Sequence, residues 1–353
     1  MVYCHKCGAK LDEDARFCRV CGTPVVAVTA ATRPTAPKKR RPFHLLPVAV
    51  LVAILITAVI VSALIFLPFY PVHFNQTNQV AKADVDNLLL DLQADVAHVN
   101  VFFKNLHGNM VMLNVTADGD VGILDDPNRA INVTFNHQTA NNSAIVIASV
   151  SQAIRWPIFY NLNVNCDVYI DSSANLSLYV RSGVGNIVMT ADTDLTLENL
   201  NIETTTGSID ASLSKGVTIA GFVSLKTTTG SVQFQMDEAE VIGNVSVNLQ
   251  STTGPVSVDL TETQKLSGNV TVSARTTTGS VDLSLVIDDD VGARIESQTN
   301  IGEISVDVQH FSGNKSPLQS NNYPAGSNLL VNLRTTTGGI HINAAYQSSS
   351  VLS

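Results

Sequence analysis

The sequence predicts an all-β fold in which about seven repeats of 22–25 residues stack into a β-solenoid, behind one apolar helix and a small cysteine-rich module. Three observations predict it. A hydroxyl-rich motif ending in glycine recurs at nearly constant spacing, and apolar residues alternate with polar ones on both sides of each glycine. The composition agrees, because 45% of the residues are hydrophobic, 14% are charged and 6% are aromatic, which suits membrane-spanning and extended β-structure better than a compact helical enzyme.

The chain divides into segments that face different surroundings. Residues 1–44 carry a net charge of +6, whereas the remainder carries −15. We expect a metal-binding module at 1–24, a flexible basic linker at 25–44, a transmembrane helix at 45–67, a juxtamembrane linker at 68–84, a β-rich capping or early-coil region at 85–181, the β-repeat solenoid at 182–345 and a tail at 346–353.

Four cysteines near the N-terminus form two Cys-x-x-Cys pairs, Cys4 with Cys7 and Cys18 with Cys21, and a glycine follows each second cysteine. Four thiolates from two tight turns suit a tetrahedral zinc ion, and glycine lets the backbone curl around the sulfurs. A spaced pair of this kind favours zinc over redox chemistry or disulfides. Residues 3–23 resemble the short zinc-ribbon modules at the N-termini of many archaeal and bacterial proteins, and this resemblance implies a structural zinc ion.

Residues 45–67 contain no charged side chain, and as a helix they would be about 35 Å long at ~1.5 Å per residue. A cleaved signal peptide has a shorter apolar core of ~7–15 residues. We therefore expect a single membrane-spanning helix. The basic cluster at 38–41 predicts a cytoplasmic N-terminus and an extracellular segment 71–353 at the cell membrane.

The basic cluster needs no nucleic acid to explain it, because membrane topology and anionic lipid account for it equally well. Within the apolar segment, Ala49, Ala53 and Thr57 lie at i, i+4 and i+8. Small residues at this spacing let two helices approach closely, so a homodimer is a further expectation.

Seven glycines mark the repeats, at intervals of 22, 23, 24, 25, 23 and 36 residues. The residues two and four positions after each glycine are apolar in all seven repeats, and the residue three positions before is always Ser or Thr. Each unit therefore reads as a strand, a glycine corner and a second strand, which bury their apolar face only by stacking on neighbouring units. The glycines are Gly185, Gly207, Gly230, Gly254, Gly279, Gly302 and Gly338.

The positions expected to be buried lie an odd number of residues before the glycine and an even number of residues after it. The alternation therefore shifts by one residue at the glycine. By this parity, the first and third threonines of each Thr-Thr-Thr-Gly motif face inward and the middle one faces outward. We expect the inward hydroxyls to hydrogen-bond with one another along the stack. The outward column offers an alternative role in binding ice or sugar, and consists of Thr205, Thr228, Thr252, Thr277 and Thr336.

The longest interval contains an insertion at 309–327, whose Phe311, Lys315 and Tyr323 are candidate binding residues. A surface insertion without function is the alternative. Upstream, residues 88–181 also alternate but do not share the register of the repeats, so they are either a capping subdomain or degenerate early coils.

The tandem "GSVDL"-like strands, preceded by "ADVAHVNVFF" and "HGNMVMLNV", resemble the putative adhesin domain, a β-repeat family of bacterial and archaeal envelope proteins. The resemblance covers residues 85–345. It implies a surface β-repeat domain and brings no catalytic residues. A zinc ribbon and one transmembrane helix in front of such a domain resemble an archaeal arrangement.

No G-x-S-x-G, H-E-x-x-H or glycine-rich phosphate motif is present in the sequence. We expect a non-enzymatic, membrane-anchored surface protein that recognises an envelope polysaccharide or protein. The alternative is a transmembrane sensor or scaffold that couples the outer domain to a cytoplasmic protein partner of the zinc ribbon. A third hypothesis is an enzyme acting on surface polysaccharide through Asp282 and Asp307.

Deleting residues 1–23 separates the first two hypotheses. An adhesion protein should keep its binding to cells, because its ligand is outside, whereas a transducer should lose its cytoplasmic output. Cell binding and recruitment of cytoplasmic protein, measured on the same deletion variant, decide between them, and loss of cell binding would contradict adhesion by the outer domain alone.

Overall fold

The computed structural model describes residues 2–12, 14–25, 45–65, 69–82, 85–122, 125–153, 161–264 and 266–347. The chain forms two compact units, Met1–Phe66 and Leu67–Ser353. Most of the linker expected at 25–44 and of the tail expected at 346–353 lies outside the described residues.

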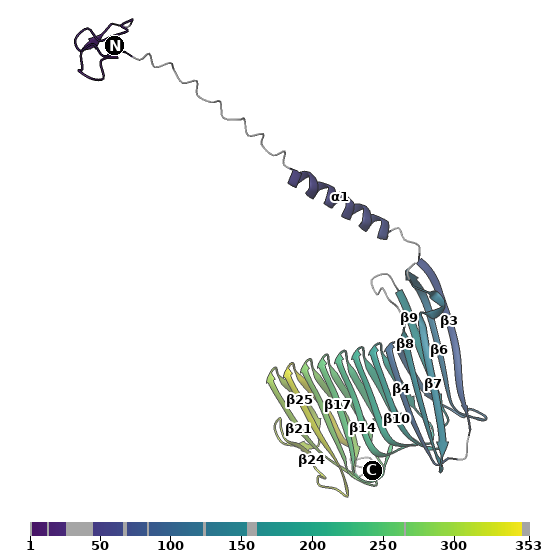
Figure 1. Cartoon of the computed structure of the whole chain (residues 1–353). Helices are drawn as coiled ribbons and strands as arrows, with labels where there is room; N and C mark the ends of the chain where they lie inside the picture. The colour runs from purple at the N-terminus through teal and green to yellow at the C-terminus, as the bar shows by residue number, and fades with distance from the viewer. Residues whose placement is uncertain are drawn as a thin grey trace. The chain divides into compact units, whose positions relative to one another are not determined.

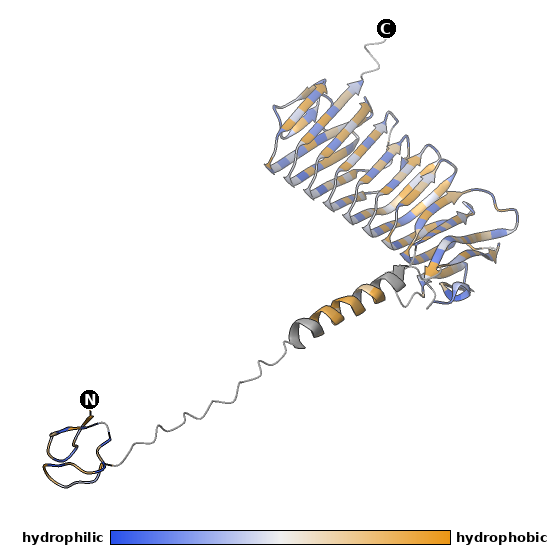
Figure 2. Ribbon diagram, turned by 90° about the horizontal axis from the view of Figure 1, so that it is seen from above, coloured by the Kyte–Doolittle hydropathy of each residue, from blue (hydrophilic) through white to orange (hydrophobic). Residues whose placement is uncertain are grey.

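Helix α1 (Leu45–Ile65) forms within the predicted apolar segment. Its described side chains, those of residues 49–60, are exposed, and all except Thr57 are apolar, as the orange colour of the helix in Figure 2 shows. The Thr57 hydroxyl donates to the carbonyl oxygens of Ala53 (2.8 Å) and Ile54 (2.9 Å). Among the described residues, no helix is both long enough and apolar enough to cross a membrane. The predicted transmembrane helix is therefore not confirmed.

The second unit is built from two large sheets whose strands lie side by side in Figure 1. In spatial order, the thirteen-stranded sheet contains β23 (Phe311–Ser312), β24 (Leu318–Ser320), β21 (Val291–Ile301), β25 (Ser327–Thr337), β19 (Val270–Thr278), β17 (Val245–Thr253), β14 (Val217–Thr229), β12 (Leu195–Thr206), β10 (Asn175–Val184), β4 (Asn87–Val96), β8 (Ser143–Gln152) and β7 (Ile131–Ala140), with β16 (Glu240–Val241) beside β14.

The eleven-stranded sheet contains, in spatial order, β22 (Ile304–Gln309), β26 (Ile340–Gln347), β20 (Val281–Asp288), β18 (Val256–Glu262), β15 (Val232–Asp237), β13 (Ile209–Ser214), β11 (Ile187–Ala191), β5 (His98–Phe103), β9 (Asn161–Ile170), β6 (Asn109–Gly122) and β3 (Phe69–Ala81). A short 3₁₀ helix, η1 (Pro127–Arg129), precedes β7.

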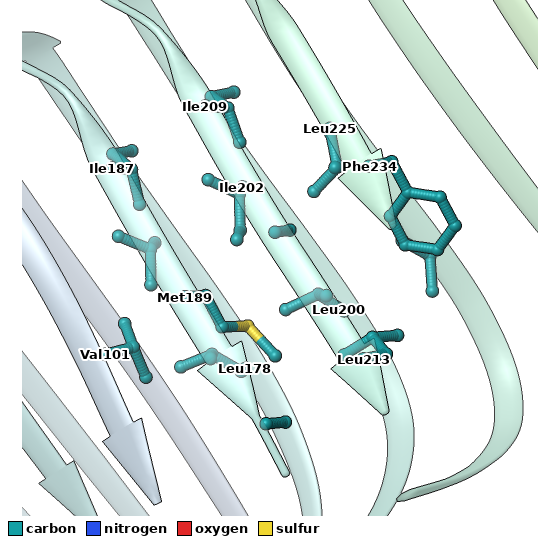
Figure 3. Close-up of a cluster of buried hydrophobic side chains, with 14 of the residues drawn as sticks. Val101, Leu178, Ile187, Met189, Leu200, Ile202, Ile209, Leu213, Leu225 and Phe234 are labelled. Atoms are coloured by element: carbon teal, nitrogen blue, oxygen red, sulfur yellow. The ribbon is translucent and has the colours of Figure 1, made fainter. Parts of the chain in front are cut away.

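Each of the seven glycines lies where the chain leaves the thirteen-stranded sheet and enters the other one. We call the two strands on either side of a corner, one from each sheet, a strand pair. Corresponding strands of neighbouring strand pairs are parallel and place equivalent residues opposite each other, as Thr204 opposite Thr227 and Ile209 opposite Val232 illustrate. Alternate side chains from both sheets meet between them, and Figure 3 shows part of this interior, including the fully buried Phe234. The alternation read from the sequence therefore describes the core.

The sequence led us to expect that the Ser and Thr hydroxyls three residues before each glycine hydrogen-bond to one another. The structure shows a different arrangement. Each of these hydroxyls donates to the carbonyl oxygen of the corner residue in the neighbouring strand pair, over 2.8–3.1 Å. In the described residues no backbone N–H reaches these carbonyls, so the hydroxyl satisfies a group that would otherwise be orphaned. The donor–acceptor pairs are Ser182 to Ala97, Thr204 to Gly185, Thr227 to Gly207, Ser251 to Gly230, Thr276 to Gly254, Thr299 to Gly338 and Thr335 to Gly279.

The third threonine of each motif is exposed, so the predicted inward direction is wrong at Thr206, Thr229, Thr253, Thr278 and Thr337. The reason is that the corner begins before the glycine, and burial resumes only two residues after it. The glycines themselves have φ between +139° and +150°, and a Cβ there would lie 1.9–2.3 Å from the next corner's carbonyl oxygen. No other residue fits both constraints.

The strand pairs do not follow one another in chain order at either end. The last pair, β25–β26, is inserted between β19–β20 and β21–β22. At the other end, β4–β5 lies between β8–β9 and β10–β11, while β3, β6 and β7 pair antiparallel and cover the edges. The region 85–181 therefore contains parallel strands that continue the order of the repeats, and antiparallel strands at the edges of both sheets.

The segment expected as a linker at 68–84 contains strand β3, which pairs antiparallel with β6. Val72 and Val80 are buried, and Phe74 packs against the core. Gln76 and Asn78 occupy two of the intervening inward positions, so the period of two is hard to see in the sequence.

We predict that Thr227→Val destabilises the second unit by about 1–3 kcal/mol, because the carbonyl of Gly207 loses the hydroxyl donor that the buried Thr227 supplies. The matched control is Thr228→Val, since Thr228 is the next residue and is exposed. Urea denaturation of both variants measures the difference. Equal stabilities would show that the corner hydrogen bond contributes nothing.

Candidate metal centre and the outer faces of the sheets

The N-terminal cysteines sit on two equivalent turns. In the first, the N–H of Gly8 donates to the carbonyl oxygen of Cys4 (2.9 Å), and in the second Gly22 donates to Cys18 (2.8 Å). Both glycines have φ of +72°, which explains why glycine follows each second cysteine. Strands β1 (Val2–Tyr3) and β2 (Lys10–Leu11) pair antiparallel around the first turn.

The two turns bring the four sulfur atoms of Cys4, Cys7, Cys18 and Cys21 within 4.8 Å of one another. The Sγ atoms of Cys4 and Cys21 are 3.6 Å apart, as are those of Cys7 and Cys18. Four sulfurs around a zinc ion at about 2.3 Å would be separated by about 3.8 Å in a tetrahedron. The observed spacing therefore fits zinc, and the four residues predicted as ligands come together.

Hydrogen bonds to two of the four sulfurs favour the thiolate forms that a metal requires. The N–H groups of Lys6 and Cys7 lower the pKa of Cys4 below its ordinary value. The hydroxyl and the N–H of Thr23 lower the pKa of Cys21 to about 6, and the Thr23 oxygen lies 3.2 Å from that sulfur. Thr23 contributes a side chain to this site that the spacing of the cysteines did not single out. At Cys7 the N–H of Ala9 lowers the pKa, but hydrogen bonds with the Cys21 and Cys18 sulfurs outweigh it and raise the pKa to about 12.

The insertion at 309–327 does not protrude as a separate loop. Its strands β23 and β24 pair antiparallel along the edge of β21, and Leu318 is fully buried. Phe311 packs against the core and Lys315 is exposed. Tyr323 lines a cavity of about 240 Å³ with Arg294 and Glu296, and neither Phe311 nor Lys315 lines that cavity. This cavity therefore contains only one of the three candidate residues.

Two grooves follow one another along the outer face of the thirteen-stranded sheet, beside the corner. The first has a volume of about 510 Å³ and spans β8 to β14; the second, of about 340 Å³, spans β17 to β21. We call their surface the corner face. It comprises the outward residues four positions before each glycine, Arg181, Glu203, Lys226, Gln250, Arg275, Gln298 and Arg334, and the middle threonines Thr205, Thr228, Thr277 and Thr336.

Arg275 and Arg334 lie directly opposite each other on β19 and β25, in the second groove. Neighbouring strands are about 4.8 Å apart, so two like charges here repel each other. Among the described side chains, the ion pairs include neither arginine. The sequence carried a signal for this column, since the fourth residue before every glycine is long and polar, and our reading of the repeat did not use it.

The other sheet has an acidic groove on its outer face, with a volume of about 450 Å³. Asp259, Asp282, Asp307 and His341 line it. Asp282 and Asp307, the residues named for an enzyme, therefore share one groove.

Comparison with known proteins identifies the N-terminal module. Residues 3–25 match the zinc-ribbon domain family. Residues 3–25 are a zinc ribbon, with four cysteines placed to hold a structural zinc ion. No curated protein matches the chain.

Several solved structures resemble the chain. Three of them are a putative cell adhesion protein from Clostridium sporogenes (12% identity, TM-score 0.43, 78% of this chain and 100% of that one), a putative adhesin from Bacteroides fragilis (12%, 0.29, 76% and 97%) and a putative adhesin from Parabacteroides merdae (10%, 0.24, 76% and 96%). At these identities and TM-scores the likenesses carry no argument about function. An archaeal origin is not supported.

We predict that the full chain binds one zinc ion and that Cys18→Ser abolishes tight binding, because three ligands leave the tetrahedron open. The control is His5→Ala, since His5 is an exposed residue between two ligands. Metal analysis after dialysis measures the stoichiometry, and NMR of the ribbon amides should show unfolding when a chelator removes the metal. Zinc loss in His5→Ala would contradict a four-cysteine site.

Proposed function

We propose that this chain is a membrane-anchored surface protein whose corner face binds an anionic polysaccharide without chemically changing it. The observation that carries the proposal is the pair of neighbouring arginines, Arg275 and Arg334, in a groove lined by amides and hydroxyls. Neither arginine forms an ion pair with any side chain that the structure describes. Guanidinium groups bind carboxylate and sulfate groups through paired hydrogen bonds, and a bound anion would relieve the repulsion between the two arginines.

The repeat of the corner face supports a polymeric ligand. Equivalent side chains recur on each successive strand, about 4.8 Å apart, so one chemical arrangement extends along the sheet. Lys226 adds a third cation that none of the ion pairs between described side chains includes. Hydroxyl and amide groups of the same face match the hydroxyl groups of sugars.

Two further features belong to the proposal. The constant parallel register supports a β-solenoid over 182–345, with each strand pair as one coil. The uncharged segment 45–67, next to a basic cluster, supports a single membrane span with the zinc ribbon in the cytoplasm and the corner face outside.

Binding of the full chain to polygalacturonate, a polymer of uronic acid carboxylates, tests the proposal. We predict that the double variant Arg275→Gln and Arg334→Gln lowers the affinity at least tenfold, because each charge-assisted hydrogen bond contributes about 1.5–3 kcal/mol. Binding should also weaken as salt rises. Isothermal titration calorimetry measures both effects.

The matched control is the double variant Asp282→Asn and Asp307→Asn, which changes the same number of charges on the other sheet. It should bind polygalacturonate as the parent does. Methyl-esterified polymer, which lacks the carboxylates, should bind weakly to every form. Release of reducing ends by the parent, lost in the aspartate variant, would instead establish the enzyme hypothesis, and absence of binding by the parent would exclude this ligand class.

A further inference from the structure

Three acidic residues meet at the far ends of two neighbouring strands. Asp237 is the last residue of β15, Glu238 follows it, and Glu262 is the last residue of β18. The two strands pair in parallel, with Asp237 opposite Thr261, and the N–H of Glu238 donates to the carbonyl oxygen of Thr261 (2.8 Å). This cluster is separate from the corner face and from the zinc ribbon.

Each glutamate accepts hydrogen bonds from residues that follow the neighbouring strand. Glu238 accepts hydrogen bonds through Oε1 from the N–H of Thr263 (3.1 Å) and from its hydroxyl. In return, the Glu262 carboxylate accepts the N–H of Ala239. Each carboxylate therefore uses its hydrogen-bonding capacity toward the backbone of the neighbouring strand pair.

One oxygen of each glutamate remains buried without a partner. Oε2 of Glu238 and Oε1 of Glu262 accept no hydrogen bond from any residue that the structure describes, and Glu262 is only 1% exposed. None of the ion pairs between described side chains involves Asp237, Glu238 or Glu262. Buried carboxylates without a counter-charge are unfavourable, so either a proton or a cation must neutralise this pair.

The electrostatics of the cluster agree. Burial, followed by the neighbouring charge of Glu238, raises the pKa of Glu262 to about 9, and Asp237 acts in the same direction. The geometry places the carboxylates near each other, because Glu238 Oε1 lies 3.1 Å from the nitrogen of Thr263, the residue that follows Glu262. A positive ion between them would relieve both the burial and the repulsion.

We propose that the unpartnered oxygens of Glu238 and Glu262 bind a calcium ion that links two neighbouring strand pairs. Both unpartnered donors are carboxylate oxygens, the kind of donor that a hard divalent cation prefers. Calcium tolerates irregular coordination and completes its shell with backbone carbonyls and water. The soft thiolates of the zinc ribbon do not compete for it.

Equilibrium dialysis of the zinc-loaded full chain against ⁴⁵Ca²⁺ tests the site, together with thermal unfolding with and without calcium. The parent should bind calcium and unfold at a higher temperature when calcium is present. Glu262→Gln keeps the shape of the side chain and removes the charge, so it should fold without calcium and lose one bound ion. The control is Glu240→Gln, because Glu240 is exposed and lies two residues after Glu238.

The proposal fails if the parent binds no calcium, or if Glu262→Gln and the parent bind the same number of ions. Either result would leave a proton as the neutralising group. Lys265 lies outside the described residues, and Lys265→Ala tests it as an alternative cation. Calcium binding that persists in Lys265→Ala supports the ion site, whereas a calcium-independent loss of stability in that variant, with no ion bound by the parent, overturns it.

Discussion

The second unit depends on one hydrogen bond, repeated at each corner between a buried hydroxyl and the carbonyl oxygen of the neighbouring corner residue. The bond needs a short side chain on one strand pair and a glycine next to its neighbour, because a Cβ would collide with the same carbonyl. The bond also fixes the register between neighbouring strand pairs, so that equivalent residues lie opposite each other. The columns of outward side chains, including the corner face, are aligned as a consequence of this fixed register.

Much of the fold could be predicted from the sequence because the glycines recur at nearly constant intervals and the apolar residues lie at fixed distances from them. The apolar positions two and four residues after each glycine are buried, apart from those of β22, as the alternation indicated. The direction of Thr206 could not be predicted, since parity assumes that the phase changes at Gly207 itself, whereas the corner starts earlier. Nor could the position of β25, because a period shows which segments are alike and does not show which of them are neighbours.

The two candidate sites differ in how much the sequence reveals. The zinc ligands are set by local spacing, so Cys4 and Cys21 could be paired in one site without any knowledge of the remaining chain. The insertion was a poorer guide, because Phe311 packs against the core and the segment mainly covers the edge of β21. The meeting of Arg275 with Arg334 required the structure, since 58 residues and five other strands lie between them in the chain.

The insertion of the last strand pair also has a consequence for synthesis. Strands β21 and β22 are made before β25 and β26, yet these later strands are their parallel neighbours. Until residues 327–347 have left the ribosome, the growing edges of β19 and β20 stay open, and β21–β22 have no parallel partner on which to fold. A chain that stops before residue 327 therefore loses the placement of two strand pairs, and only a chain that includes residues 327–347 can close this end.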